Sequence, residues 1–138
     1  MLKKLIDTNI FIDRLQNPEQ HRDVFVSEGV VYLSAVVFME LLAGAHTKRA
    51  AKAVYDLYNH FRRLDRLVIP SAVDYERAGD ILARLQTARG YTIKKSASIT
   101  NDCLIAASAR SIGATLYSQN RKDFEAIRAL MEFKIVFP

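Results

Sequence analysis

Three acidic residues interrupt apolar segments of this 138-residue chain, and their surroundings indicate that they carry chemistry. They are Asp7 in LKKLIDTNIF, Glu40 in AVVFMELLAGA and Asp102 in TNDCLIAASA. A buried carboxylate is tolerated when it is paired, heavily hydrogen-bonded or bound to a metal ion. Three scattered acids of this kind therefore predict one shared, oxygen-rich site.

Electrostatic repulsion explains why such a site would need a cation. Two carboxylates ~5 Å apart repel by about 3 kcal/mol at an effective dielectric of about 20. Ligation by oxygen alone, without nearby His or Cys, selects the hard ions Mg²⁺ or Mn²⁺. Such ions activate a water molecule for attack on a phosphodiester, so the predicted chemistry is hydrolysis without a protein nucleophile.

Each acid also has a purely structural interpretation. Asp7 could form an Asx-turn or cap the next helix, and Asp102 could cap a helix or lie favourably in its first turn. Glu40 is harder to explain in this way, because no Lys or Arg stands three or four positions away to pair with it. The combination of the three acids therefore argues for a site more strongly than any one of them.

Short β-branched or aliphatic segments alternate with longer helical patterns along the chain. The predicted strands are residues 3–6, 30–33, 67–69, 115–117 and 134–137. The predicted helices are residues 10–15, 19–27, 35–45, 48–64, 72–89, 99–112 and 121–130. Ser34 and Thr47 are expected N-caps, and Gly113 is an expected helix stop. Ser71 and Asp74 resemble a capping box.

Strands separated by helices require crossover connections, which predicts one α/β domain over residues 1–138. Its expected architecture is an α/β/α sandwich with a mainly parallel sheet of about five strands and helices on both faces. Ligands bind such sheets beyond the carboxyl ends of the strands, near the point where the strand order reverses.

The candidate residues fall at that edge of the predicted sheet. Asp7 follows the first strand, Glu40 lies about two turns into the helix after the second, and Asp102 is expected in the first turn of the helix before the fourth. Residues 118–120 follow the fourth strand, and Asp123 comes three positions later. Four chain segments can therefore converge on one site.

The composition limits the class of protein. Its 20 Lys and Arg residues against 15 Asp and Glu give a net charge of +5, which favours an anionic partner. The single cysteine, Cys103, excludes an intrachain disulfide, and the histidines lack the spacing of a zinc site. No segment approaches ~20 apolar residues and no cleavable leader is apparent, so a soluble, cytoplasmic protein without membrane contact is expected.

Taken in order, these segments resemble PIN-domain ribonucleases and, among them, the VapC-type toxins of bacterial and archaeal toxin–antitoxin pairs. The resemblance spans the whole chain and rests on three motifs. They are residues 5–13 (LIDTNIFID), 37–44 (VFMELLAG) and 101–109 (NDCLIAASA). Each motif alone is weakly specific, but the ordered set in so short a chain is specific.

The resemblance assigns roles to individual residues. The implied catalytic metal ligands are Asp7, Glu40 and Asp102. Thr8 is expected to support Asp7 through its hydroxyl group. Ser118 is expected to contact the metal ligands without binding the ion itself. The fourth motif, residues 117–124 (YSQNRKDF), departs from the pattern, because many members carry an acid at the position of Asn120. Asn120 could offer a carbonyl oxygen or hold a water, and Asp123 could compensate if the turn directs it inward, so both are candidate catalytic residues.

Basic residues near these motifs are candidate contacts for a phosphate backbone. They are Arg84, Arg89, Lys94, Lys95, Arg121 and Lys122, with Tyr91 as a candidate stacking surface. The resemblance implies an endoribonuclease that cuts tRNA or ribosomal RNA in an exposed loop, where unstacked bases are reachable. It also implies a homodimer, a small antitoxin whose tail covers the active-site groove, and higher-order complexes on DNA through that antitoxin. The apolar helices within residues 35–64 offer surface for both protein contacts.

Other interpretations need features that this chain lacks or leaves open. A phosphoacceptor receiver domain would need an Asp ending the third strand, where Pro70 and Ser71 stand. A haloacid-dehalogenase-like phosphatase would need a second Asp two places after the first, where Asn9 stands. Two alternatives stay open: a PIN-like module that binds RNA or protein with weak or lost catalysis, and a PIN component of a DNA-binding regulatory complex.

Overall fold

A five-stranded parallel sheet forms the centre of the computed structural model, which describes residues 1–91 and 97–138. Its strands are β1 (Lys3–Ile6), β2 (Val30–Ser34), β3 (Leu67–Val68), β4 (Thr115–Tyr117) and β5 (Lys134–Val136). The strand order is β3-β2-β1-β4-β5, and each neighbouring pair is parallel. The predicted parallel sheet is confirmed.

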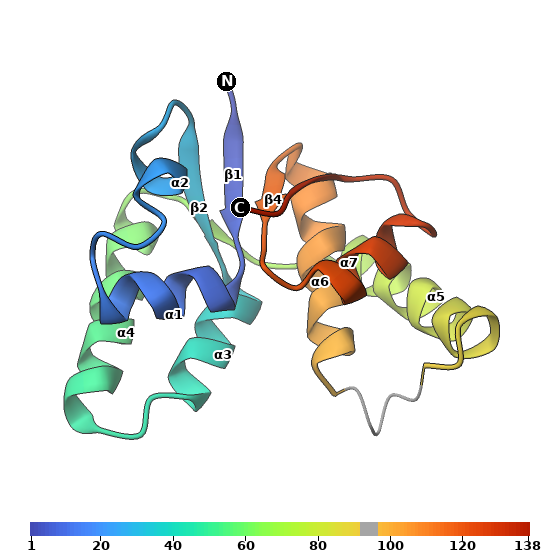
Figure 1. The fold of residues 1–138 in the computed structure, drawn as a ribbon, viewed down its shortest axis with the longest axis horizontal. Coiled ribbons are helices and arrows are strands. Elements are labelled where there is room, and N and C mark those ends of the chain that lie inside the picture. Colours follow the sequence, from blue (N-terminus) through green and yellow to red (C-terminus); the bar gives the residue numbers. More distant parts are fainter. Residues whose placement is uncertain (92–96) are drawn as a thin grey trace.

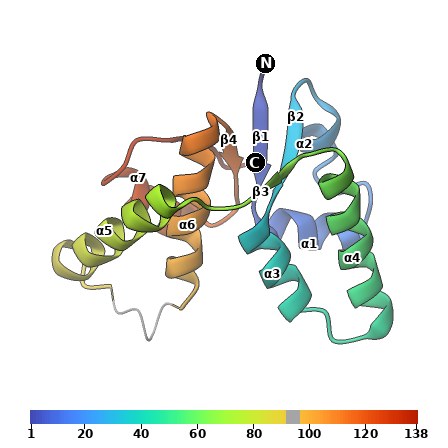
Figure 2. The same ribbon diagram turned by 180° about the vertical axis from the view of Figure 1, so that it is seen from behind.

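Helices connect the strands and cover both faces of the sheet. They are α1 (Thr8–Gln16), α2 (Arg22–Val26), α3 (Ala35–Ala43), α4 (Lys48–Arg63), α5 (Ala72–Ala88), α6 (Ala97–Ile112) and α7 (Arg121–Arg128). In Figure 1, α1 and α7 lie on the near side, whereas Figure 2 shows α4 and α5 in front. The expected α/β/α sandwich is therefore confirmed.

Local side-chain chemistry explains where several helices begin and end. The Ser34 hydroxyl accepts the Val36 N–H at 3.1 Å, and the Thr47 hydroxyl accepts the Ala50 N–H at 3.0 Å. Ser71 and Asp74 form the predicted capping box. Gly113 ends α6 with a φ of 69°, a left-handed conformation that glycine adopts without steric cost.

The core lies between the sheet and its helices, and it contains one unusual residue. Leu5, Ile6, Leu33 and Leu116 are fully buried on the three central strands. Lys4 is also buried, with 1% of its surface exposed, and its Nζ donates to the Val24 carbonyl at 2.9 Å. In the described part of the chain, no helix combines the length and apolar character needed to cross a membrane.

The strand order reverses beside β1. The chain passes from β1 to β2 and β3 on one side, then crosses to β4 and β5 on the other. The Asp7 N–H donates to the Tyr117 carbonyl at 2.9 Å, so the pairing of β1 with β4 continues to the carboxyl edge. A crevice beyond this edge, between β1 and β4, is where parallel sheets usually bind ligands.

Candidate active site

Asp7 stands at the carboxyl end of β1, where its side chain has two roles. Its Oδ1 accepts the Thr8 backbone N–H at 2.8 Å, which makes Asp7 the N-cap of α1. Its Oδ2 accepts the Ser118 hydroxyl at 2.6 Å and the Asn9 amide at 3.2 Å. The capping and site interpretations of this residue are therefore compatible, since the carboxylate caps a helix and faces β4 at once.

Glu40 reaches the same region from the sixth position of α3. Its Oε1 accepts the Thr8 hydroxyl at 2.6 Å, and its Oε2 accepts the Asn101 amide at 3.4 Å. Two expectations are corrected here. Glu40 is half-buried rather than buried, and the Thr8 hydroxyl supports Glu40 rather than Asp7. As the first residue of α1, Thr8 gives its free N–H to Asp7, which leaves the hydroxyl for the neighbouring α3.

Asp102 lies in the second turn of α6, not in the first, because α6 begins two residues earlier than predicted. Asp102 is 4% exposed, and its Oδ2 accepts the Asn120 amide at 2.9 Å. The same amide nitrogen lies 3.1 Å from Asp123 Oδ2, so Asn120 bridges two acids. The Tyr91 hydroxyl donates to Asp123 Oδ1 at 3.0 Å. The turn after β4 therefore directs Asp123 toward the other acids.

Burial and mutual repulsion perturb these carboxyl groups. Burial raises the pKa of Asp102 to about 8, and the charges of Asp7, Glu40 and Asp123 contribute in the same direction. Burial also raises the pKa of Asp7, although hydrogen bonds from Ser118 and Thr8 oppose this shift. Within residues 1–91 and 97–138, no Lys or Arg forms an ion pair with any of these four acids. The acids therefore form one uncompensated cluster.

The donor chemistry of the cluster fits a hard cation. Carboxylate oxygens converge from four segments without a basic partner, and a bound cation would relieve their repulsion. As the side chains lie, no group of three His, Cys, Asp or Glu among the described residues is arranged to hold a metal ion. The residues present thus fit such an ion in kind, while their carboxylates are engaged by hydrogen-bond donors.

The predicted basic residues fall into four groups. Arg121 and Lys122 open α7 directly after Asn120 and are exposed. Arg89 follows α5. Burial and the contact with Asp123 raise the pKa of Tyr91, and the charge of Arg89 opposes this shift. Arg84 points elsewhere, because its guanidinium donates to the Leu130 carbonyl at 3.3 Å. Lys94 and Lys95 lie outside the described residues.

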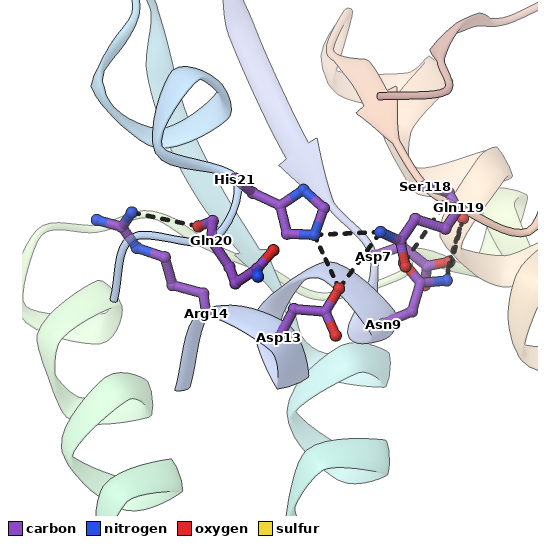
Figure 3. Close-up of polar contacts among 8 residues, drawn as sticks. All are labelled: Asp7, Asn9, Asp13, Arg14, Gln20, His21, Ser118 and Gln119. Atoms are coloured by element: carbon purple, nitrogen blue, oxygen red, sulfur yellow. Dashed lines mark hydrogen bonds and ion pairs between the residues drawn. The ribbon is translucent and has the colours of Figure 1, made fainter. Parts of the chain in front are cut away.

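Several residues that contact the acids were not predicted. Asn9 and Asn101 hold Asp7 and Glu40 through their side-chain amides. Each is a polar residue inside an apolar motif, and that signal could have identified them. Gln119 donates its backbone N–H to Asn9 Oδ1 at 3.3 Å, and its amide lies beside Asp13 and His21 (Figure 3). No local sequence pattern indicates this last set, because it joins three separate segments.

A groove of about 470 Å³ runs beside Glu40, between α1, α3 and α4. Its apolar lining includes Ile12, Leu15, Leu41 and Val54, and Glu40 also lines it. Leu15 is 43% exposed, so this groove presents a large apolar side chain to solvent.

Comparisons with known proteins agree with this geometry. A family model described as PIN domain matches residues 4–130. The tRNA(fMet)-specific endonuclease VapC of Shigella flexneri is 31% identical over 138 residues, covering 94% of this chain and 96% of that protein. The DNA-bound VapBC of Salmonella typhimurium superposes with a TM-score of 0.71 at 25% identity, over 99% of this chain and 98% of that one. VapBC2 of Rickettsia felis, bound to a promoter DNA fragment, has the same fold, with a TM-score of 0.69 at 22% identity over 98% of each chain.

Proposed function

We propose that this chain, which belongs to the VapC-type members of the PIN-domain family, is a Mg²⁺- or Mn²⁺-dependent endoribonuclease. We further propose that it is the toxin of a type II toxin–antitoxin pair. The family supports nuclease activity, and the acid cluster is the proposed place for it. The observation that carries the proposal is the convergence of Asp7, Glu40, Asp102 and Asp123 at the point where the strand order reverses.

The proposed ligands are Asp7, Glu40 and Asp102, with Asn120 and Asp123 completing the site. When bound, the ion would supply positive charge for the scissile phosphate and activate water for attack. Ser118 and Asn9 orient the Asp7 carboxylate, while Thr8 and Asn101 orient Glu40. These contacts come from neutral donors, which leave the negative charge of the acids available to a cation.

The proposed substrate is RNA with an exposed loop, in a tRNA or ribosomal RNA. Arg89, whose charge acts on Tyr91, and the exposed Arg121 and Lys122, which directly follow Asn120, are the proposed phosphate contacts. The Shigella flexneri relative is named for its action on tRNA(fMet), so initiator tRNA is the first substrate to examine. A cytoplasmic site of action follows from such a substrate.

Purified protein is expected to cleave initiator tRNA at a discrete position when Mg²⁺ or Mn²⁺ is present. Excess EDTA should abolish cleavage, because neutral donors cannot replace the charge of the ion. Denaturing gel electrophoresis of end-labelled tRNA measures the product. A tRNA that binds to the protein but stays uncut at millimolar Mn²⁺ would favour the non-catalytic PIN-like alternative instead.

The proposed partners are a second copy of this chain and a small antitoxin, through which the complex would reach DNA. Two of the related structures, from Salmonella typhimurium and Rickettsia felis, are VapBC complexes bound to DNA. The apolar groove between α1, α3 and α4 suits the apolar side of an antitoxin tail, and a tail in it would also cover Glu40.

The Leu15→Glu variant is expected to lose its antitoxin while still cutting RNA. A buried leucine contributes about 1.5–3 kcal/mol, and a carboxylate in its place would meet an apolar surface. The measurement is co-purification with the small protein encoded beside this chain's gene. Val26→Glu is the matched control, since Val26 is 62% exposed on α2 and does not line the groove. Equal retention of the partner by both variants would contradict this location.

A further inference from the structure

Three polar side chains form a cluster on the outer side of the active site (Figure 3). His21 Nε2 lies 2.8 Å from Asp13 Oδ2, and the side-chain nitrogen of Gln119 lies 3.3 Å from the same oxygen. Asp13 belongs to α1, His21 precedes α2, and Gln119 lies between β4 and α7. The cluster therefore joins three segments at the rim of the site.

The hydrogen positions in this cluster follow from donor and acceptor chemistry. A carboxylate only accepts, so the short contact to Asp13 requires that His21 Nε2 carries a hydrogen. The nitrogen of Gln119 lies 3.1 Å from His21 Nε2, but two donors face each other there, and this contact is not a hydrogen bond. Asp13 Oδ2 therefore accepts from both His21 and Gln119.

The backbone of His21 is shaped for this contact. Its φ is 55°, a left-handed conformation that costs a non-glycine residue roughly 1–2 kcal/mol. His21 is the N-cap residue of α2, yet its side chain makes no capping hydrogen bond and turns to Asp13 instead. The imidazole is only 12% exposed, so the ion pair or hydrogen bond is partly shielded from water.

A path of hydrogen bonds leads from this cluster to the acids. The Gln119 backbone N–H donates to Asn9 Oδ1 at 3.3 Å, which orients the Asn9 amide so that its nitrogen donates to Asp7 Oδ2 at 3.2 Å. The two chain neighbours of Gln119 also contact the acids: Ser118 donates to Asp7 at 2.6 Å, and Asn120 donates to Asp102 at 2.9 Å. Gln119 thus lies in a turn between Ser118 and Asn120, and its contact with Asp13 anchors this turn on the side away from the acids.

We infer that His21 and Asp13 are positioning residues, which hold Gln119 and thereby fix the carboxylates of the proposed metal site. This inference rests on the proposed function for its effect on cleavage. The placement of the Asn9 and Asn120 amides, however, is a property of the metal-free protein. The positioning role and the proposed function can therefore be tested separately.

The test compares His21→Ala, Asp13→Ala and the double variant with the wild type. In ¹H–¹⁵N NMR spectra without metal, the Gln119 backbone amide and the Asn9 side-chain amide should shift in all three variants. Mn²⁺ affinity from calorimetry and kcat should each fall by about 10-fold or more, as for other residues behind metal ligands, with KM for RNA unchanged. The double variant should lose no more than the larger single one, because both changes break one connection.

Two further variants separate positioning from a general effect on the fold. Arg14→Ala is the matched control. It removes the hydrogen bond from α1 to the carbonyl of Gln20, the residue before His21 (Figure 3), and the stacking of Arg14 on Phe25. It leaves the contacts of Gln119 in place. Its NMR amide signals at Asn9 and Gln119, its Mn²⁺ affinity and its kcat should match the wild type. His21→Gln keeps a donor near the position of Nε2 and should restore most of kcat.

The outcomes distinguish the two claims. Unshifted Asn9 and Gln119 amides with wild-type kcat in His21→Ala would overturn the positioning role, as would equal losses in His21→Ala and Arg14→Ala. A wild-type protein that binds no Mn²⁺ and cuts no RNA would overturn the proposed function. The NMR comparison would then still decide whether His21 and Asp13 position the site.

Discussion

Replacing Asp7 or Asp102 by Asn is expected to reduce RNA cleavage by at least ~1000-fold while the protein stays folded. Each substitution removes one negative charge from a proposed metal ligand, and a loss of about 4 kcal/mol of transition-state stabilisation corresponds to that factor. The shape of the side chain is preserved, so Ser118 can still donate to residue 7 and Asn120 to residue 102. Initial rates on tRNA at saturating Mn²⁺ measure the effect. Cleavage within tenfold of the wild type in both variants would remove the acids from the mechanism.

The Asp102→Asn substitution should also stabilise the metal-free protein at neutral and alkaline pH. The pKa of Asp102 rises from 3.8 to about 8 on folding, so the folded state holds this proton more tightly than the unfolded state. The associated stability is complete below pH 3.8 and is lost as pH rises through about 8. Thermal unfolding in EDTA should therefore show a Tm that falls over this range in the wild type and falls less in Asp102→Asn. Parallel pH profiles would contradict the raised pKa.

The same cleavage assay tests which of Asn120 and Asp123 completes the site. Asn120 bridges Asp102 and Asp123, while Asp123 also accepts from Tyr91. If both complete the site, Asn120→Ala and Asp123→Ala should each raise the Mn²⁺ concentration needed for half-maximal cleavage, about 10-fold or more. Wild-type behaviour in one of them would assign the role to the other.

Replacing Lys4 by Ala is expected to destabilise the fold by about 3–5 kcal/mol. The ammonium group donates to the carbonyls of Val24 and Ser27, at 2.9 and 3.2 Å, and its removal takes this donor from a buried acceptor and a part-buried one. The lost aliphatic stem adds a cavity between β1 and α2. Urea unfolding followed by circular dichroism measures the free energy of unfolding.

Lys3→Ala is the control for this substitution. Lys3 is the neighbour of Lys4 on β1 and is only half-buried, and its Nζ lies 5.9 Å from the centroid of the Tyr32 ring. Its loss should cost less than about 1 kcal/mol. Equal losses for the two lysines would mean that the charge of the strand, rather than the buried contacts of Lys4, stabilises the fold.

Local chemistry made much of the fold predictable. The hydroxyls of Ser34 and Thr47 cap the helices that immediately follow them, and the Ser71–Asp74 box begins α5, because capping groups act within three residues. The element bounds are less exact. α6 begins at Ala97 rather than Ile99, and this shift moved Asp102 from the predicted first turn to the second.

The donors around each acid were not predictable in the same way. Thr8 was expected to support Asp7 because the two are adjacent, yet its hydroxyl reaches Glu40, 32 positions away. The cluster of Asp13, His21 and Gln119 was missed altogether, since its formation depends on a left-handed residue before α2 and on a turn after β4.

The sequence by itself determined that carboxylates stand in apolar segments at the carboxyl ends of alternating strands, because periodicity and the residues that follow a strand are local properties. Only the tertiary structure decided which donor holds which acid. Ser118 meets Asp7 across 111 positions, and Gln119 approaches His21 across 98. Such pairs depend on the order of the strands and on how the helices pack against the sheet. Neither can be read from the spacing of residues along the chain.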